Sequence, residues 1–585
     1  MTTETPRAAR AADKYYYLPA VLLTAAAVLG GLRAWGALAA FSALFFVCLV
    51  FFDEEFSFSG LGIWGLLAAW LAAAVAFSPE PLNSFCEFSR YVLVFSFFIF
   101  SSRRGTGARG AWTSSVFLLG AAAAGIAIYE IALGAWRGSV FGLWRGSVLG
   151  INPNYSSAFM AAAFAGAAAL LSGSEDKKTR FYAAAGTVFF AAGLLAAKSR
   201  GGLLAALAAL VYLLCLKKAW RTLLYLTAGI LLVVAVMPAE QFNVLLKLEQ
   251  PLSLERLKIW GTALRAISGS PLFGRGPGLF ERIFEVFKFP FYNGISYYGH
   301  STLQAHSQLL NLAAEAGIPA ACLFAWGWGR AVFTSGNEDK WGMVLKMFAV
   351  TLFVQSAVDI IFYSGALQLF FFGTLGLLST VKARPAAAPG SRARALAFLL
   401  ACWSAAFILR YGFEREKACA LNAGTAPEIR EACLKKAMVF APGDAVLLEA
   451  SIPLSIGLYG NYAYTAALAG DAALKRPKDP FPRFERAQAF YFAGALASAK
   501  TELYGVLSVE PAFLRARLRL AEILAAEKNY PAAAEELRRI EAELARNGPA
   551  PATPYDRELR SLPEGPYAAI RRELLKKKAA AGTRR

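Results

Sequence analysis

Two histidines, His300 and His306, are the only ones in the 585 residues, and they lie in one short stretch of the chain. Histidine is the side chain whose proton exchanges near neutral pH. The stretch closes a polar segment between two hydrophobic runs, so the pair predicts acid–base chemistry at one mouth of a helix bundle. The alternative is that one or both rings only hydrogen-bond the loop, and the two residues alone leave both interpretations open.

His306 directly precedes a run, Ser307 to Gly317, that predicts the start of a hydrophobic helix. The partial positive charge at a helix N-terminus lowers the pKa of an imidazole. A neutral His306 is suited to accepting a proton. Glu315, further along the same predicted helix, either orients polar groups or pairs with an arginine.

Arg200 is a candidate for binding phosphate oxygens. Arg200 joins two hydrophobic runs on a side of the membrane where positive charge is disfavoured, and a guanidinium fork matches phosphate geometry. The alternative for Arg200 is a lipid-headgroup anchor. Arg256 belongs to a predicted amphipathic helix over 254–266, whose apolar stripe includes Leu257 and Leu264.

A glycine-rich segment follows that helix. Gly274, Gly276 and Gly278 alternate with Arg275 and Pro277, which lets backbone amides approach a ligand while Arg275 adds charge. A Gly-x-Gly-x-Gly pattern is weak evidence by itself, and a plain loop is the favoured alternative.

A second loop on the same face repeats a Trp-Arg-Gly-Ser unit at Trp136 and Trp144 and ends in Asn152-Pro153-Asn154. Its Trp-Arg pairs, including Arg145, either stack on sugar rings or mark the interfacial aromatic belt. The loop therefore supplies Arg145, Asn152 and Asn154 as candidate substrate-binding residues.

The elements that must position these residues are membrane helices. The chain is 57% hydrophobic, and hydrophobic stretches long enough to cross a bilayer recur from residue 17 to 409. We predict thirteen spans, several of them short: 17–32, 36–52, 57–77, 85–102, 111–135, 155–172, 181–197, 203–216, 222–238, 308–333, 343–362, 364–380 and 395–409.

Basic connections set the predicted orientation. Alternate loops carry Lys and Arg and are assigned to the cytoplasm, so the 136–154 loop, the long 239–307 segment and the C-terminal region face outward. Asp359, within a predicted span, should face the bundle interior. The net charge of +20 is attributed to topology and headgroup contact, because no nucleic-acid-binding motif accompanies it.

Residues 410–585 form a separate, charged, helical region after a membrane domain over 1–409. Ala441-Pro442, Arg476-Pro477 and Glu510-Pro511 each end a predicted helix, at intervals of 35 and 34 residues. This period resembles the tetratricopeptide repeat, a scaffold that binds partners or peptides; generic helical hairpins are the alternative. Cys419 and Cys433 in this region either form a disulfide or are two small core residues, and no metal-ligand spacing occurs.

The candidate residues together resemble the O-antigen ligase / O-antigen polymerase superfamily over roughly 140–380. The resemblance rests on Asn152-Pro153-Asn154, Ser199-Arg200-Gly201-Gly202, Arg256 with Trp260, Gly274-Arg275-Gly276-Pro277-Gly278, and His306-Ser307 with Glu315-Ala316-Gly317. Two features depart from the family pattern. Ser307 stands where the family often has Asn, and the C-terminal region is absent from a minimal ligase.

The resemblance implies an all-α, multi-pass glycosyltransferase of the bacterial inner membrane, active on the extracytoplasmic face. It would move a glycan from a polyprenyl-pyrophosphate to an acceptor hydroxyl, without metal or cofactor. His306 is then the candidate base, with Arg200 and Arg256 as the pyrophosphate clamp. Substrate binding is expected of the remaining candidates: Arg275, Gly274, Gly276, His300, Asn152, Asn154 and Arg145.

Several functions compete at this point. The favoured acceptor is a lipid-A core sugar; another lipid-linked glycan (a polymerase) or a protein hydroxyl are the alternatives, and the repeat region would offer a site for a protein partner. A transporter or flippase would instead need polar residues and broken helices near the bilayer midplane. A scaffold without catalysis would leave the 239–307 segment without a purpose.

Overall fold

A computed structural model describes residues 15–52, 61–136, 152–238, 252–335, 339–379, 391–546 and 548–582. The regular elements of these residues are all helices, which confirms the all-α prediction. The chain divides into two compact units. Unit 1 comprises Met1–Gly278 and Gln304–Tyr411, and unit 2 comprises Leu279–Leu303 and Gly412–Arg585.

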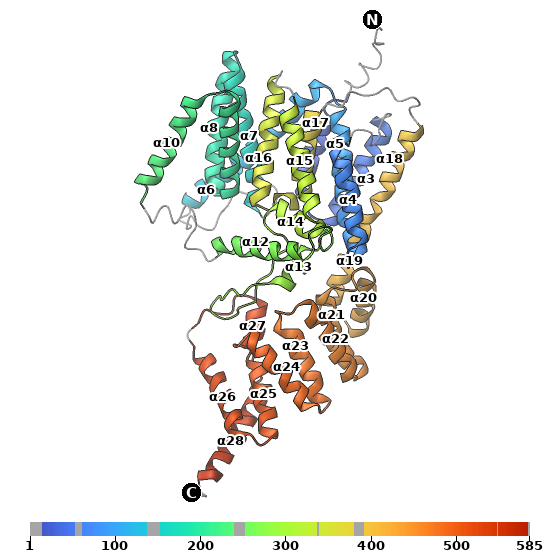
Figure 1. The fold of residues 1–585 in the computed structure, drawn as a ribbon, viewed down its shortest axis with the longest axis vertical. Coiled ribbons are helices and arrows are strands. Elements are labelled where there is room, and N and C mark those ends of the chain that lie inside the picture. The colour runs from blue at the N-terminus through green and yellow to red at the C-terminus, as the bar shows by residue number, and fades with distance from the viewer. Residues whose placement is uncertain are drawn as a thin grey trace. The chain divides into compact units, whose positions relative to one another are not determined.

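Unit 1 is a bundle of apolar helices (Figure 1). Its helices are α2 (Leu18–Val28), α3 (Trp35–Phe52), α4 (Ile63–Ala76), α5 (Pro81–Ser102), α6 (Thr106–Trp136), α7 (Pro153–Gly173), α8 (Lys177–Ala197), α9 (Arg200–Leu216), α10 (Trp220–Val236), α12 (Leu252–Gly269), α14 (Gln308–Ala316), α15 (Ile318–Thr334), α16 (Lys340–Val358), α17 (Gly365–Ser379) and α18 (Ser391–Trp403). Short 3₁₀ turns, η1 (Gly30–Leu32) and η2 (Ile361–Tyr363), adjoin α2 and α17.

The helices make this a multi-span membrane protein. Among the described residues, six segments are long and apolar enough to cross a bilayer: Trp35–Phe52, Pro81–Ser102, Gly107–Leu133, Pro153–Gly173, Lys177–Ala197 and Lys340–Val358. Shorter apolar helices, such as α2, α4, α9 and α17, correspond to further predicted spans.

Small residues allow the helices of unit 1 to approach closely. Helix α7 is almost entirely buried and packs against α6, α8 and α16. A Cβ added at Gly193 of α8 would lie 2.8 Å from the Cα of Ala124 on α6, so only glycine fits there. Close backbone approach through small residues is a common basis of helix association in membranes.

Four predicted spans are divided or shortened in the structure: 17–32 into α2 and η1, 395–409 between α18 and α19, and two others that bear on the candidate site. The predicted span 308–333 is broken at Gly317, which has φ +90°, and is divided into α14 and α15. The predicted span 343–362 ends at Val358, so Asp359 lies beyond the last residue of α16 and not within a helix. Hydropathy detects neither break because the flanking residues remain apolar.

Helix α12 confirms the helix predicted over 254–266 but corrects its apolar face. Leu257 and Leu264 are exposed, whereas Ile259, Ala263 and Ile267 are buried. The helix packs on α14 (Figure 1), and its buried side is formed by isoleucine and alanine residues and not by these two leucines.

Unit 2 consists of helical hairpins. Its helices are α13 (Phe280–Phe287), α20 (Pro427–Phe440), α21 (Ala445–Tyr459), α22 (Tyr462–Lys475), α23 (Pro480–Phe492), α24 (Leu496–Val509), α25 (Leu514–Ala526), α26 (Tyr530–Ala545), α27 (Pro554–Arg560) and α28 (Glu564–Gly582); α19 (Ala405–Leu421) contains the boundary between the units. The ends of α20, α22 and α24 confirm the three helix ends predicted from the Pro-containing dipeptides.

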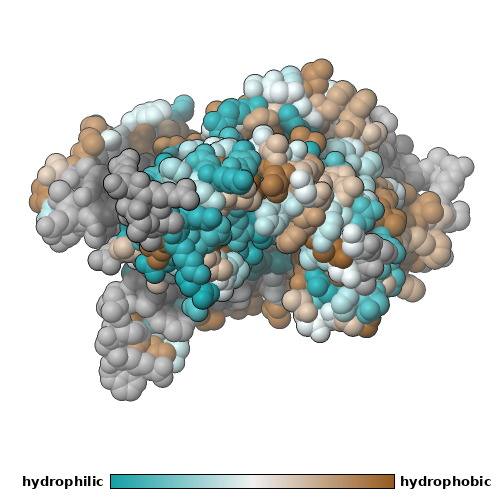
Figure 2. Space-filling model, turned by 90° about the horizontal axis from the view of Figure 1, so that it is seen from below, coloured by the Kyte–Doolittle hydropathy of each residue, from teal (hydrophilic) through white to brown (hydrophobic). Residues whose placement is uncertain are grey.

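One apolar cluster packs the later hairpins of unit 2, with Phe484, Leu503, Phe513 and Ile540 fully or almost fully buried, and a separate cluster around Leu434 and Leu447 packs the earlier ones. Hydrophilic residues cover much of the face that Figure 2 presents. A disulfide joins Cys419 and Cys433, which answers the question that the sequence left open. Unit 2 also takes in Leu279–Leu303, which belong to the 239–307 segment.

Gly317 offers a test of the break between α14 and α15. A Cβ there would overlap the backbone carbonyl of Leu272 at a φ that side chains rarely adopt. Gly317→Ala is therefore expected to cost about 1–3 kcal/mol or more and to lower the melting temperature in detergent. Gly229→Ala on α10, where an added Cβ meets nothing within 4 Å, is the control. Equal melting temperatures for the two variants would contradict the break.

Candidate active site

Hydrogen bonds between polar side chains fix three helices of unit 1 to one another. Ser199 Oγ donates to Asn154 Oδ1 at 2.9 Å, and Ser157 Oγ lies 2.9 Å from Ser199 Oγ. Gln355 Nε2 on α16 donates to the Asn154 carbonyl at 2.9 Å and to Ser157 Oγ at 3.0 Å. The start of α7, the start of α9 and the last turn of α16 therefore form one polar cluster.

Capping residues determine where α7 and α9 begin. Asn152 Oδ1 accepts from the Asn154 amide at 2.9 Å and caps α7. Ser199 caps α9, because its Oγ accepts from the Gly202 amide at 3.3 Å. Such caps satisfy amides that have no partner within the helix. Arg200 is therefore the first residue of α9, at a fixed helix end.

Asp359 lies against the start of α9. A Cβ added at Gly201 would be 3.0 Å from Asp359 Oδ2, so the glycine lets the carboxylate approach the helix end. Asp359 is only 2% exposed. Burial has the largest effect and raises the pKa of its carboxyl above the usual value, and the positive charges of Arg256 and, more weakly, Arg200 offset this only in part.

Arg256 of α12 pairs with this buried carboxylate. Its Nη2 lies 3.7 Å from Asp359 Oδ1, and its Nη1 donates to the Val358 carbonyl at 3.1 Å. The Arg256 side chain keeps 27% of its surface exposed. Asp359 and the end of α16 thus hold the guanidinium of a side chain that is only partly buried.

His306 lies just before α14 in a left-handed backbone conformation, with φ +52°. The residues on either side of it are held by α14. Ser307 caps the helix by accepting from the Leu310 amide at 3.4 Å, and the Ala305 amide donates to Asn311 Oδ1 at 3.0 Å. A non-glycine residue at positive φ persists only where its surroundings hold it, and such residues cluster at functional sites.

The imidazole of His306 is neutral near neutral pH. Burial, and next the charge of Arg256, lower its pKa from the usual 6.5 to about 4. Its Nδ1 is buried, without a hydrogen-bond partner among the described residues. The predicted direction of the pKa shift is confirmed, but its causes are burial and an arginine, where we expected the helix N-terminus.

Unit 1 therefore brings together Asn154, Arg200, Arg256 and His306. It adds Asp359, which the sequence places within a span. Ser157 and Gln355 were missed altogether. Polar residues inside apolar runs were the available signal, since Gln355 precedes Asp359 by about one helical turn.

Arg33 is a further cation that the sequence analysis missed. Its guanidinium lies 5.6 Å from the ring centroid of Tyr155 and 5.7 Å from that of Tyr363. Tyr155 follows Asn154 directly, and Tyr363 ends η2, which follows Asp359. Arg33 follows the first hydrophobic run, so its place after an apolar stretch could have identified it.

The glycine-rich segment supports α14. The Arg275 amide donates to the Ala314 carbonyl at 3.0 Å, and the Gly276 amide donates to the Glu315 carbonyl at 2.8 Å. Gly274 has φ +65°, and a Cβ there would overlap the Glu315 backbone. Two of the amides that we expected near a ligand are thus used to close the C-terminal end of α14.

Two other candidates are placed apart from this cluster. His300 belongs to unit 2, where its ring lies among Phe284, Phe289 and Phe291 at centroid distances of 5.7, 4.7 and 6.0 Å. The Trp-Arg loop with Arg145 lies outside the described residues.

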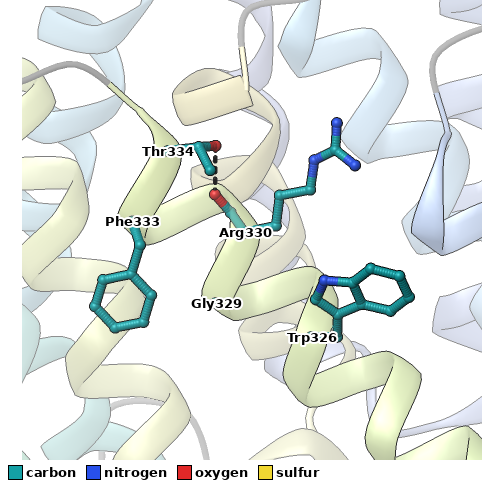
Figure 3. Close-up of a pocket in the computed structure, with 5 residues that line it drawn as sticks. All are labelled: Trp326, Gly329, Arg330, Phe333 and Thr334. Carbon is teal, nitrogen blue, oxygen red and sulfur yellow. Dashed lines mark hydrogen bonds between the residues drawn. The ribbon is translucent and has the colours of Figure 1, made fainter.

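A surface pocket on α15 is not part of this cluster. It is lined by Trp326, Gly329, Arg330, Phe333 and Thr334, and Thr334 Oγ1 donates to the Arg330 carbonyl at 2.6 Å (Figure 3). These residues occupy the second half of α15, away from its start at Ile318 beside α14.

The fold and the cluster define a multi-span helical membrane protein with a neutral histidine, a carboxylate and arginines gathered at helix ends. The comparison with protein families agrees with this description. Residues 185–325 match the family model described as O-antigen ligase, a family of membrane glycan transferases of ligase and polymerase type. This part of the chain is therefore similar to the O-antigen ligase family, and the matched residues include Arg200, Arg256 and His306. No curated protein matches the chain.

The titration of His306 tests this geometry without any substrate. With only two histidines, ¹⁵N-histidine NMR in micelles resolves each ring, and a His300→Gln variant assigns them. We expect His306 to titrate at about 4. Arg256→Gln should raise that pKa while leaving it below 6.5, because burial persists. An Arg256→Gln protein whose His306 titrates as in the wild type would contradict the proximity of the two groups.

Proposed function

We propose that this protein transfers a glycan from a polyprenyl-pyrophosphate carrier to an acceptor hydroxyl on the extracytoplasmic face of the bacterial inner membrane. The observation that carries the proposal is the neutral, buried His306 beside Arg256, within the matched O-antigen ligase domain. Glycan transfer of this kind needs a base for the hydroxyl and cations for the leaving group.

In the proposed reaction the acceptor oxygen bonds to the anomeric carbon as the bond from that carbon to the pyrophosphate oxygen breaks. His306 takes the hydroxyl proton, and the polyprenyl-pyrophosphate leaves with the electron pair. Arg256 and Arg200 stabilise the negative charge that develops on it. Asp359 holds Arg256 in place on the side away from the ligand.

Substrate binding would also strengthen the base. Arg256 lowers the pKa of His306 in the free protein. A bound pyrophosphate would neutralise part of that positive charge, so the pKa of His306 would rise towards the range where a base acts best near neutral pH. The same arginine would thus bind the donor and couple its arrival to proton transfer.

The proposed orientation has two supports. Alternate connections are basic, which assigns them to the cytoplasm and the ends of the candidate site to the opposite face. The same charge pattern assigns the C-terminal region to the outer side. The Cys419–Cys433 disulfide suits an oxidising compartment such as the periplasm. For the acceptor we favour a lipid-A core sugar; a second lipid-linked glycan or a protein hydroxyl would use the same chemistry.

Transfer from a synthetic polyprenyl-pyrophosphate glycan, measured in proteoliposomes with chelator present, tests the proposal. We expect His306→Ala to lower kcat about 10²–10⁴-fold, because the base is lost. Arg256→Ala should lower the rate about 10²–10³-fold, and Arg256→Lys should restore it only in part. Arg265→Ala, a loss of charge on the same helix, is the matched control and should retain most activity.

The proposal fails if His306→Ala transfers glycan at the wild-type rate at equal expression. It also fails if the wild-type protein moves the lipid-linked glycan between leaflets without transferring it to lipid-A core, glycan or protein acceptors.

A further inference from the structure

Residues Leu279–Leu303, here called the inserted segment, are bound by the helical hairpins of unit 2. The first contact is an ion pair in which Arg282 of α13 meets Asp444, which is fully buried on its side chain. Asp444 also caps α21 and accepts from Lys417 Nζ at 2.7 Å. This capping carboxylate therefore has a second role as an anchor for the inserted segment.

The second contact repeats the arrangement one hairpin further along. Arg476 Nε donates to Glu285 Oε2 of the inserted segment at 3.3 Å. Arg476 also pairs with Asp479 at 2.6 Å and Glu449 at 2.7 Å. Glu285 accepts in addition from Ser301 Oγ at 2.9 Å, so the two ends of the inserted segment meet at this point.

The third contact is made to the backbone of the inserted segment. The side chain of Glu510 accepts from the Tyr297 amide at 2.9 Å and from the Tyr298 amide at 2.7 Å, and its third donor is Tyr555 Oη at 3.1 Å. Glu510 is fully buried. A carboxylate that receives two consecutive backbone amides binds a particular chain conformation, because both donors must point the same way.

These anchors follow the period of the hairpins. Asp444 and Asp479 are 35 residues apart, and Arg476 and Glu510 are 34 residues apart, so each lies at the turn that ends one hairpin. The inserted segment thus runs across three successive turns of the repeat. Within the inserted segment, the His300 ring packs among three phenylalanine rings, so this histidine has a structural role.

We infer that the helical hairpins of unit 2, here called the hairpin domain, bind the inserted segment as an internal ligand and thereby position His306. Glu510 is the principal positioning residue. The inserted segment ends at Leu303, and His306 follows three residues later on the same chain. Its other end continues from Gly278, the last residue of the glycine-rich support of α14. The catalytic part of this inference rests on the proposed function.

The helical hairpins of unit 2 then have a role within their own chain. A helical-repeat scaffold suggests an external binding partner. The turns that carry Asp444, Arg476 and Glu510, however, already bind residues of the same chain. Ordering the inserted segment in this way removes conformational freedom from the residues that lead to His306.

The test compares Glu510→Ala, Glu510→Gln and a control, Glu527→Ala, in the full-length protein. Glu527 pairs with Lys500 at 2.7 Å within the hairpin helices, so it matches Glu510 in type and domain. Hydrogen exchange reports the Tyr297 and Tyr298 amides, histidine NMR reports the pKa of His306, and the transfer assay reports kcat and KM.

For Glu510→Ala we expect the exchange of the Tyr297 and Tyr298 amides to rise at least about tenfold, because their acceptor is lost. The pKa of His306 should move from about 4 towards 6.5 as the residues that lead to it lose their fixed conformation. The kcat should fall about tenfold with little change in the KM for the donor. Glu510→Gln, which keeps one acceptor oxygen, should lie between the wild type and Glu510→Ala, and Glu527→Ala should match the wild type.

Three results would overturn the inference. Unchanged amide exchange in Glu510→Ala would show that Glu510 does not hold the inserted segment. Faster exchange with an unchanged His306 titration would show binding without positioning. Equal losses in Glu510→Ala and Glu527→Ala would show a general defect of the domain. A wild-type protein without transfer activity would end the proposed function, while exchange and titration would still decide the binding and the positioning.

Discussion

The buried carboxylate of Asp359 is the constraint on which the candidate site depends. An ion removed from water is costly unless cations and donors surround it, so Asp359 requires Arg256 beside it and the start of α9 against it. Gly201 at the start of α9 leaves room for this carboxyl group, and Arg256 of α12 pairs with it and with the Val358 carbonyl at the end of α16. Arg256, once placed, lowers the pKa of His306 and so connects the carboxylate to the proposed base.

Much of the fold follows from the sequence because the hydrophobic runs are long. The helical class and the helix ends at the Pro-containing dipeptides of the C-terminal region agree with the structure. Helices lie at the predicted spans, and six of them are long and apolar enough, among the described residues, to cross a bilayer. The breaks at Gly317 and Asp359 do not follow from hydropathy. Gly317 is required by a tertiary contact with the Leu272 backbone, and Asp359 by charges that arrive from α9 and α12. Contacts between distant segments leave little trace in local pattern.

The candidate site, like the fold, could be predicted from the sequence only in part. Arg200, Arg256 and His306 were found by residue type and position, since charges and histidines are rare between hydrophobic runs. Ser157 and Gln355 were missed because small or uncharged polar residues are unremarkable in a span until a partner is known. The glycine-rich segment was correctly singled out, but its chemistry was not, because only the structure shows that its amides meet the carbonyls at the end of α14.

The central claim, that His306 is the base and that its surroundings keep it neutral, is tested most directly by the pH dependence of kcat/KM for transfer by the wild-type protein. This quantity reports the free protein, in which the pKa of His306 is about 4. A base must be unprotonated, so activity should persist as the pH falls through 6.5 and be lost only near pH 4. A loss of activity centred at 6.5, or an acid limb at pH 4 that His306→Ala leaves in place, would contradict the account.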